Sequence, residues 1–178
     1  MAFGAPCRRQ RRLSRPSPMS LHIRPATAED VGTIHSLMQE LAVFEKLLDI
    51  FEATPQSVHE ALFGNAPAAE CLIAEWDGKP VGYALYFHNF STFLGRRGLY
   101  LEDVYVQPSM RGKGVGQALL RRLARIAVER QCGRFEWTVL DWNQPAIDFY
   151  TSQGATVLPD WRVVRMTGEA LGRFAKGD

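Results

Sequence analysis

The sequence contains few cysteines and no long apolar run. The three cysteines, Cys7, Cys71 and Cys132, are odd in number and widely spaced, which argues against a disulfide framework and a zinc site. No window approaches the roughly 18 apolar residues that a membrane-spanning helix needs. The four histidines are scattered, and no Ser-His-Asp arrangement can be assembled. We therefore expect a soluble, cytoplasmic protein that has no metal site and no membrane partner.

Acidic side chains are missing from the first 19 residues, which carry five arginines: Arg8, Arg9, Arg11, Arg12 and Arg15. A basic tail of this kind could bind nucleic acid or act as a transit peptide. The segment also contains three prolines and lacks an apolar stripe. We expect residues 1–19 to be a disordered leader or a misassigned start, and residues 20–178 to form a single domain. Nucleic acid is not expected as a partner.

Strand and helix patterns alternate from Leu21 onward. Thr27 with Asp30 predicts a capped helix start, and Asp77-Gly78 predicts a hairpin turn. Helices are predicted at residues 27–41 and 54–64, from 115 to a stop at Gly133, and from 143 to 154. Strands are predicted at residues 21–24, 71–76, 81–87, 99–106, 135–140 and 161–166, with Arg96 and Arg97 in a loop. This order predicts an α/β (α+β) fold, a mixed central sheet covered by helices.

Three alternating glycines, Gly112, Gly114 and Gly116, join a predicted strand to a predicted helix. Such a turn points backbone N–H groups outward at the positive end of a helix dipole, which suits a pyrophosphate. Arg111 and Lys113 can add positive charge at its rim. The spacing fits neither the dinucleotide fingerprint nor the P-loop.

The segment from Arg111 to Gly116 resembles the acetyl-CoA signature of GNAT acetyltransferases. Residues 23–27, 100–103 and 141–150 are similar to the diamine (spermidine/spermine) and thialysine N-acetyltransferase branch of that superfamily. The resemblance covers residues 21–175. It implies the GNAT fold, in which the mixed sheet splays at the cofactor site and carries helices on both faces. It also implies acetyl-CoA as the cofactor and a homodimer.

The resemblance also assigns roles to single residues. Tyr150 matches the family's general acid, and Glu102 matches the acid that binds the amine and helps to deprotonate it. The candidate cofactor-binding residues are Val104, Tyr105, Val106, Arg111, Gly112, Lys113, Gly114, Val115, Gly116, Gln117, Asn143, Pro145, Ala146 and Tyr150. The candidate amine-site residues are Phe44, Glu45, Glu102, Glu136, Trp137, Thr138 and Asp160.

The reaction explains why these residue types are needed. An alkylammonium with a pKa of about 10.4 must lose a proton before it can attack, which costs about 4–5 kcal/mol at neutral pH. A positioned acid or base contributes roughly 10²–10⁴-fold, which is of the same order. Glu102 could relay the proton of the amine, and the Tyr150 phenol could protonate the departing thiolate. With no well-placed cysteine nucleophile, we expect direct attack in a ternary complex.

The substrate is less well defined by the sequence. Glu45 favours a cationic amine, whereas Arg96 and Arg97 would repel a long polyamine. A diamine or a lysine-like or thialysine-like amino acid, whose carboxylate meets an arginine, is therefore favoured over a polyamine. Two other classes stay open, a protein or peptide N-acetyltransferase and a non-catalytic acyl-CoA-binding module.

Overall fold

The computed structural model describes residues 20–177, and the predicted leader at residues 1–19 lies outside this range. Two units make up the chain, Met1–Trp137 and Thr138–Asp178. No helix among the described residues is long and apolar enough to cross a membrane.

The first unit is built on one five-stranded sheet. Its strands follow the order of the sequence: β1 (Leu21–Pro25), β2 (Glu70–Trp76), β3 (Lys79–Ser91), β4 (Arg96–Val106) and β5 (Phe135–Trp137). The first four strands pair antiparallel, and β5 runs parallel to β4. A parallel pair needs a crossover connection, and a helix supplies it here. The sheet is therefore mixed, as predicted.

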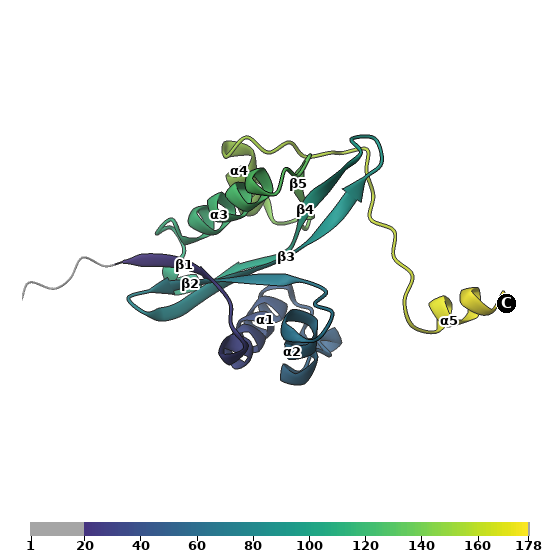
Figure 1. Cartoon of the computed structure of the whole chain (residues 1–178), viewed down its shortest axis with the longest axis horizontal. Helices are drawn as coiled ribbons and strands as arrows, with labels where there is room; N and C mark the ends of the chain where they lie inside the picture. Colours follow the sequence, from purple (N-terminus) through teal and green to yellow (C-terminus); the bar gives the residue numbers. More distant parts are fainter. Residues whose placement is uncertain (1–19, 178) are drawn as a thin grey trace, which may run out of the picture. The chain divides into compact units, whose positions relative to one another are not determined.

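Helices cover both faces of this sheet (Figure 1). On one face lie α1 (Val31–Glu45) and α2 (Pro55–Phe63), and on the other lies α3 (Val115–Glu129). Short 3-10 turns occur at η1 (Ala28–Asp30), η2 (Leu48–Ile50) and η3 (Pro108–Met110). The predicted cap is present, because the Thr27 backbone N–H donates to Asp30 Oδ2 at 2.8 Å. The layers of the GNAT fold, inferred from the resemblance, are confirmed.

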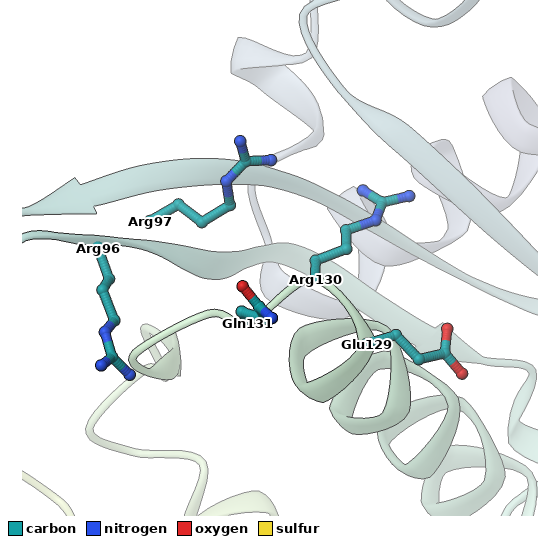
Figure 2. A pocket seen from close by; sticks show the side chains of 5 residues that line it. All are labelled: Arg96, Arg97, Glu129, Arg130 and Gln131. Atoms are coloured by element: carbon teal, nitrogen blue, oxygen red, sulfur yellow. The ribbon is translucent and has the colours of Figure 1, made fainter.

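The predicted loop at Arg96 and Arg97 is wrong, because both residues belong to β4 and pair with β3. Only residues 92–95 turn the chain between these strands. The side chains of Arg96 and Arg97 lie near Arg130, which follows the last turn of α3 (Figure 2). Pairing with β3 extends β4 beyond its apolar stretch, and the sequence pattern gives no sign of this.

Two element ends and two whole elements also differ from the prediction. Helix α3 ends at Glu129, well before Gly133, because Gln131 takes a left-handed conformation (φ 56°) and the Cys132 N–H bonds to the Ala127 carbonyl at 2.8 Å. Strand β5 stops at Trp137 instead of residue 140. In the second unit, α4 (Gln144–Ser152) matches the prediction, but residues 161–166 form no strand, and α5 (Gly168–Lys176) was not predicted.

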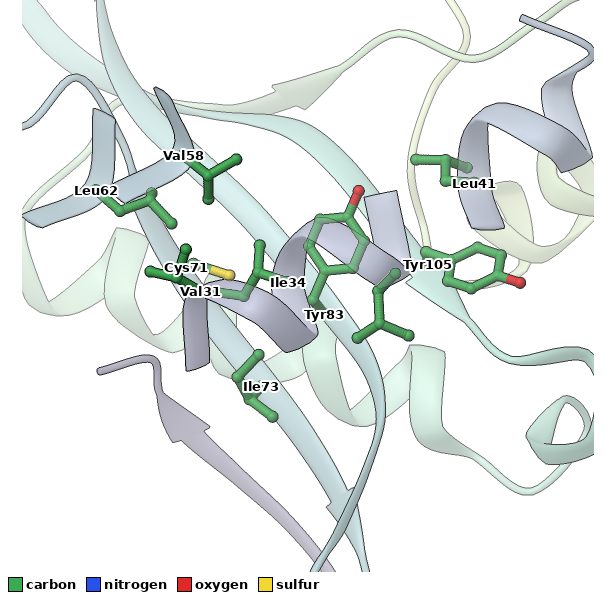
Figure 3. Packing of buried hydrophobic residues seen from close by; sticks show 10 residues of the cluster. Val31, Ile34, Leu41, Val58, Leu62, Cys71, Ile73, Tyr83 and Tyr105 are labelled. Carbon is green, nitrogen blue, oxygen red and sulfur yellow. The ribbon is translucent and has the colours of Figure 1, made fainter. Parts of the chain in front are cut away.

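The core between the sheet and the α1 and α2 layer is apolar and tightly enclosed (Figure 3). Ile34 of α1 and Ile73 and Tyr83 of the sheet have no exposed surface. Tyr105 of β4 reaches the same cluster. On α3, Leu119 and Leu123 are also fully buried. Burial of a large apolar side chain contributes about 1.5–3 kcal/mol, so these layers hold β3 and β4 firmly in place.

Candidate active site

Strand β4 contains a bulge at Glu102. Opposite β4, Leu85 pairs with Asp103 and the next residue, Tyr86, pairs with Leu101, so Glu102 is an extra residue without a partner on β3. A regular strand would turn Leu101 and Asp103 to the same face. The extra residue breaks that alternation, so the two side chains lie on opposite faces of the sheet.

Neighbours across the β3–β4 ladder confirm this change of face. Leu101 lies opposite Tyr86, whose ring is 6.0 Å from the guanidinium of Arg130 at the end of α3. Asp103 lies opposite Leu85, which packs on the α1 cluster. Directly opposed residues share a face of the sheet. Asp103 is therefore directed toward the α1 layer, and Leu101 toward α3.

Asp103 lies in an acidic and largely enclosed environment. The Tyr83 hydroxyl donates to Asp103 Oδ2 at 3.1 Å. The pKa of Asp103 is raised to about 6, chiefly by burial; the hydrogen bond from Tyr83 lowers it, and the negative charges of Glu102 and Glu45 add to the rise. Burial also raises the pKa of the Tyr83 phenol well above its ordinary value, so Tyr83 remains a donor.

The end of α1 brings the predicted amine-site residues Phe44 and Glu45 to this part of the sheet. Glu45 is the last residue of α1, and Lys46 closes the helix in a left-handed conformation (φ 62°). Burial raises the pKa of the Glu45 carboxyl, and its charge acts on both Asp103 and Tyr83. Three acids, Glu45, Glu102 and Asp103, therefore share one region, which favours a cation.

The predicted cofactor loop follows β4 directly. Gly112 and Gly114 both have left-handed backbones, with φ of 74° and 82°. Gly114 caps α3, so the first amides of that helix begin at the loop. A Cβ built at Gly112 or Gly114 would meet no atom within 4 Å, so the loop is open on that side. An open turn at a helix N-terminus fits the pyrophosphate of coenzyme A.

The basic residues of the loop are anchored to apolar neighbours. The Arg111 guanidinium lies 4.5 Å from the ring centroid of Phe44, and its Nε donates to the Val106 carbonyl at 3.1 Å. Lys113 Nζ lies 5.7 Å from the ring centroid of Trp76. Arg111 thus ties the cofactor loop to the end of α1, a link that sequence reasoning missed.

Other candidate residues are placed in β5 and in the second unit. Glu136 of β5 is already engaged, because Asn89 Nδ2 donates to it at 2.6 Å and Arg134 lies at 3.0 Å. In the second unit, the Asn143 carbonyl accepts from the Ala146 N–H at 3.0 Å and begins α4, with Pro145 in its first turn. Tyr150 lies on the same helix. Thr138 and Asp160 lie in this unit outside its helices.

The hollow between β4 and the end of α3 is mainly basic, in contrast to the acidic region around Asp103. It measures about 410 Å³, and its lining holds three arginines, Arg96, Arg97 and Arg130, against one carboxylate, Glu129 (Figure 2). Arg97 is six residues before Asp103, which is about 20 Å along a strand. Like charge would repel an ammonium there. No cluster of metal-ligating side chains occurs within residues 20–177.

Residues 34–155 match the acetyltransferase (GNAT) family. The chain belongs to this family. The GNAT chain is 38% identical over 167 residues to the thialysine N-epsilon-acetyltransferase of Sus scrofa, covering 88% of this chain and 98% of that protein. It is 33% identical over 203 residues to the L-ornithine N5-acetyltransferase of Arabidopsis thaliana, covering 89% of each.

Among solved structures, an integron cassette protein from the mobile metagenome of V. cholerae is similar, with a TM-score of 0.75 and 28% identity. That similarity covers 89% of this chain and 99% of the cassette protein. The chain is therefore an acyltransferase of the GNAT family, close to thialysine-type and polyamine-type acetyltransferases. GNAT acetyltransferases in general use acetyl-CoA.

Proposed function

We propose that this enzyme transfers the acetyl group of acetyl-CoA to the primary amine of a small cationic molecule. The observation that carries the proposal is the acidic region of Glu45, Glu102 and Asp103, joined by the end of β4 to the open glycine loop. Carboxylates in a partly buried site favour an ammonium, and the loop favours a diphosphate. The amine and acetyl-CoA would therefore bind next to each other along β4.

The favoured substrate is a diamine or a lysine-like or thialysine-like amino acid. The relatives named above act, by their names, on thialysine and L-ornithine. Arg96 and Arg97 do not favour an amino acid over a diamine. They lie about 20 Å along β4 from Asp103, too far to hold the carboxylate of a lysine-sized molecule bound there in the same chain.

The chemistry is direct attack by the amine. Acetyl-CoA supplies the thioester; the backbone of Val104, Tyr105 and Val106 would orient its pantetheine arm, and the loop from Gly112 to Gln117 its diphosphate. Burial raises the pKa of the Cys71 thiol to about 12, so this cysteine stays protonated and is a poor nucleophile. The Tyr150 phenol would protonate the thiolate that leaves.

We also propose a homodimer in the cytoplasm. Three apolar side chains of the second unit support the dimer, since Trp161, Val163 and Val164 are 76%, 69% and 93% exposed. Exposed apolar groups gathered in one stretch are typical of surfaces that another chain covers. Light scattering should therefore give twice the mass of one chain.

A thiol-release assay with acetyl-CoA tests the function. Diamines, polyamines, lysine analogues and amino-terminal peptides should be compared, and acetyl-CoA binding should be measured separately by calorimetry. Turnover of peptides alone would indicate a protein acetyltransferase, and binding without turnover an acyl-CoA-binding module. Absence of acetyl-CoA binding would refute the proposal. Replacing Tyr150 with Phe should lower kcat while leaving acetyl-CoA affinity nearly intact.

A further inference from the structure

We propose that the basic hollow beside Arg97, Arg130 and Gln131 binds the phosphate group of a small phosphate monoester. Helix α3 has 15 residues, so about 22 Å separate the glycine loop at its start from this hollow at its end. The inference does not rest on the proposed function, since it concerns neither acetyl transfer nor the cofactor loop. Its basis is the direction of the arginine side chains, their partners and the size of the hollow.

The register of β4 turns Arg97 toward α3. Arg97 is two residues before the fully buried Leu99 and four before Leu101, which is directed toward α3. Alternate residues share a face of a strand, and no bulge interrupts this stretch. Arg96 therefore points to the opposite face. Figure 2 agrees, because Arg97 and Arg130 extend to the same side of the hollow and Arg96 extends away from them.

Most hydrogen-bond donors of Arg97 and Arg130 are unused. A guanidinium carries five N–H donors. The Arg97 guanidinium makes no hydrogen bond and no ion pair within residues 20–177. Arg130 donates from Nη1 and Nη2 to the Glu70 carboxylate, and its Nε makes no hydrogen bond in that range. Gln131 adds a side-chain amide to the lining. Arginine forks of this kind suit the oxygens of a phosphate.

The carboxylates near the hollow leave the charge of Arg97 uncompensated. Glu129 lines the hollow, but its Oε1 lies 3.7 Å from Arg122 Nη1, and its side chain extends away from Arg97 (Figure 2). Glu70 pairs with Arg130. No carboxylate of the described residues forms an ion pair with Arg97. A dianion would supply the missing negative charge.

His88 shows that the charges of the two arginines act at one place. It lies opposite Leu99 on the β3–β4 ladder, so it shares the α3 face with Arg97. Its Nε2 atom is buried and has no hydrogen-bond partner among the described residues. Burial lowers the pKa of His88, the positive charges of Arg130 and Arg97 lower it further, and Glu70 raises it. A bound dianion would offset the two positive charges and so raise this pKa.

The size of the hollow favours a phosphate that carries an organic group. Its volume of about 410 Å³ falls within the range of roughly 300–1,000 Å³ that is typical of pockets for small organic ligands. Arg96 also lines the hollow although it is directed away from Arg97. Its aliphatic stem would offer the organic group an apolar contact.

The first test measures the binding of inorganic phosphate and of glycerol 3-phosphate to the full chain by calorimetry at constant ionic strength. Arg97→Gln should weaken the binding of both about 10-fold, because it removes charge-assisted hydrogen bonds. The matched control is Arg96→Gln, which removes the same charge one residue away on the opposite face and should have a much smaller effect. Glycerol 3-phosphate should bind more tightly than phosphate.

Three results would overturn the proposal: no binding, equal losses in the two variants, or inorganic phosphate binding as tightly as glycerol 3-phosphate. An anion held only by the glycine loop would give equal losses, since both arginines lie far from that loop. If Arg97→Gln fails to fold, Arg97→Lys takes its place. It keeps the positive charge but loses the paired donors, so it should also weaken binding.

The second test follows the four histidine rings by NMR as the pH is changed. Sulfate serves as the probe, because it is a tetrahedral dianion throughout the range in which histidine titrates. His88→Gln identifies the His88 signal by its loss. Compared with chloride at the same ionic strength, sulfate should raise the pKa of His88, and the rise should vanish in Arg97→Gln and persist in Arg96→Gln. An unchanged pKa of His88, or an equal rise at all four histidines, would contradict the assignment of the site.

Discussion

Replacing Asp103 with Asn should stabilise the folded protein at pH 8. The pKa of Asp103 is about 6 in the folded protein, against 3.8 for an ordinary aspartate. Each pKa unit corresponds to 1.36 kcal/mol, so a charged Asp103 destabilises the folded state by about 3 kcal/mol. Asparagine has no charge to bury, and its carbonyl can still accept the hydrogen bond from Tyr83.

The sign of this effect depends on pH. Because folding raises the pKa of Asp103, the folded state holds the proton more tightly than the unfolded chain does. The stabilising contribution of the protonated form is complete below about pH 3.8 and is lost as the pH rises through about 6. The difference in free energy of unfolding between Asp103→Asn and wild type should therefore grow by about 3 kcal/mol from below pH 3.8 to pH 8.

Urea unfolding, followed by the fluorescence of the four tryptophans, measures this difference directly. Wild type and variant should be compared at about pH 3 and pH 8. A difference that is equal at both pH values would show that the Asp103 charge has no folding cost. A variant that loses stability relative to wild type as the pH rises would show that the charge stabilises the fold, which would refute the argument from the burial of Asp103.

Three further substitutions test the framework around the site. Gly82→Ala should cost about 1–3 kcal/mol in urea unfolding, because its Cβ would lie 2.5 Å from the Tyr105 carbonyl oxygen across the β3–β4 ladder. Gly114→Ala meets no such neighbour but must keep a φ of 82°, so strain of about 1–2 kcal/mol should weaken acetyl-CoA binding in calorimetry. The Asp30 carboxylate accepts hydrogen bonds from Arg24 at 2.6 and 2.7 Å, and its pKa is held at about 2. Asp30→Asn should therefore lower the free energy of unfolding by about 2 kcal/mol. This loss should be complete above pH 3.8 and should shrink as the pH falls toward 2.

Local signals in the sequence predicted the elements that depend on local geometry. The Asp77-Gly78 turn has both residues in the left-handed region, with φ of 51° and 75°, as tight hairpins need. Pro55 after the capping residue Thr54 begins α2 as expected. In each case the residues that determine the geometry are neighbours in the chain, so the pattern carries the information.

Elements that depend on a distant partner were not predictable in the same way. Residues 161–166 have a strand-like composition, but they pair with no strand among the described residues, and a strand is stable only within a sheet. Conversely, Arg96 and Arg97 have no strand signal but extend β4 because β3 lies beside them. Pairing, and not propensity, decides both segments.

The position of Asp103 shows the same limit at the site itself. Counting alternate residues from the buried Leu99 and Leu101 would place Asp103 and Tyr105 on the same face as those leucines. The extra residue at Glu102 reverses this, so β4 buries its leucines toward α3 and then turns Tyr105 toward α1. Only the pairing with β3 reveals the reversal. A carboxylate placed immediately after it is drawn into the α1 layer, where burial and two other acids prepare it for a cation. The chemistry of this site therefore depends on an irregularity in β4 that the sequence pattern does not show.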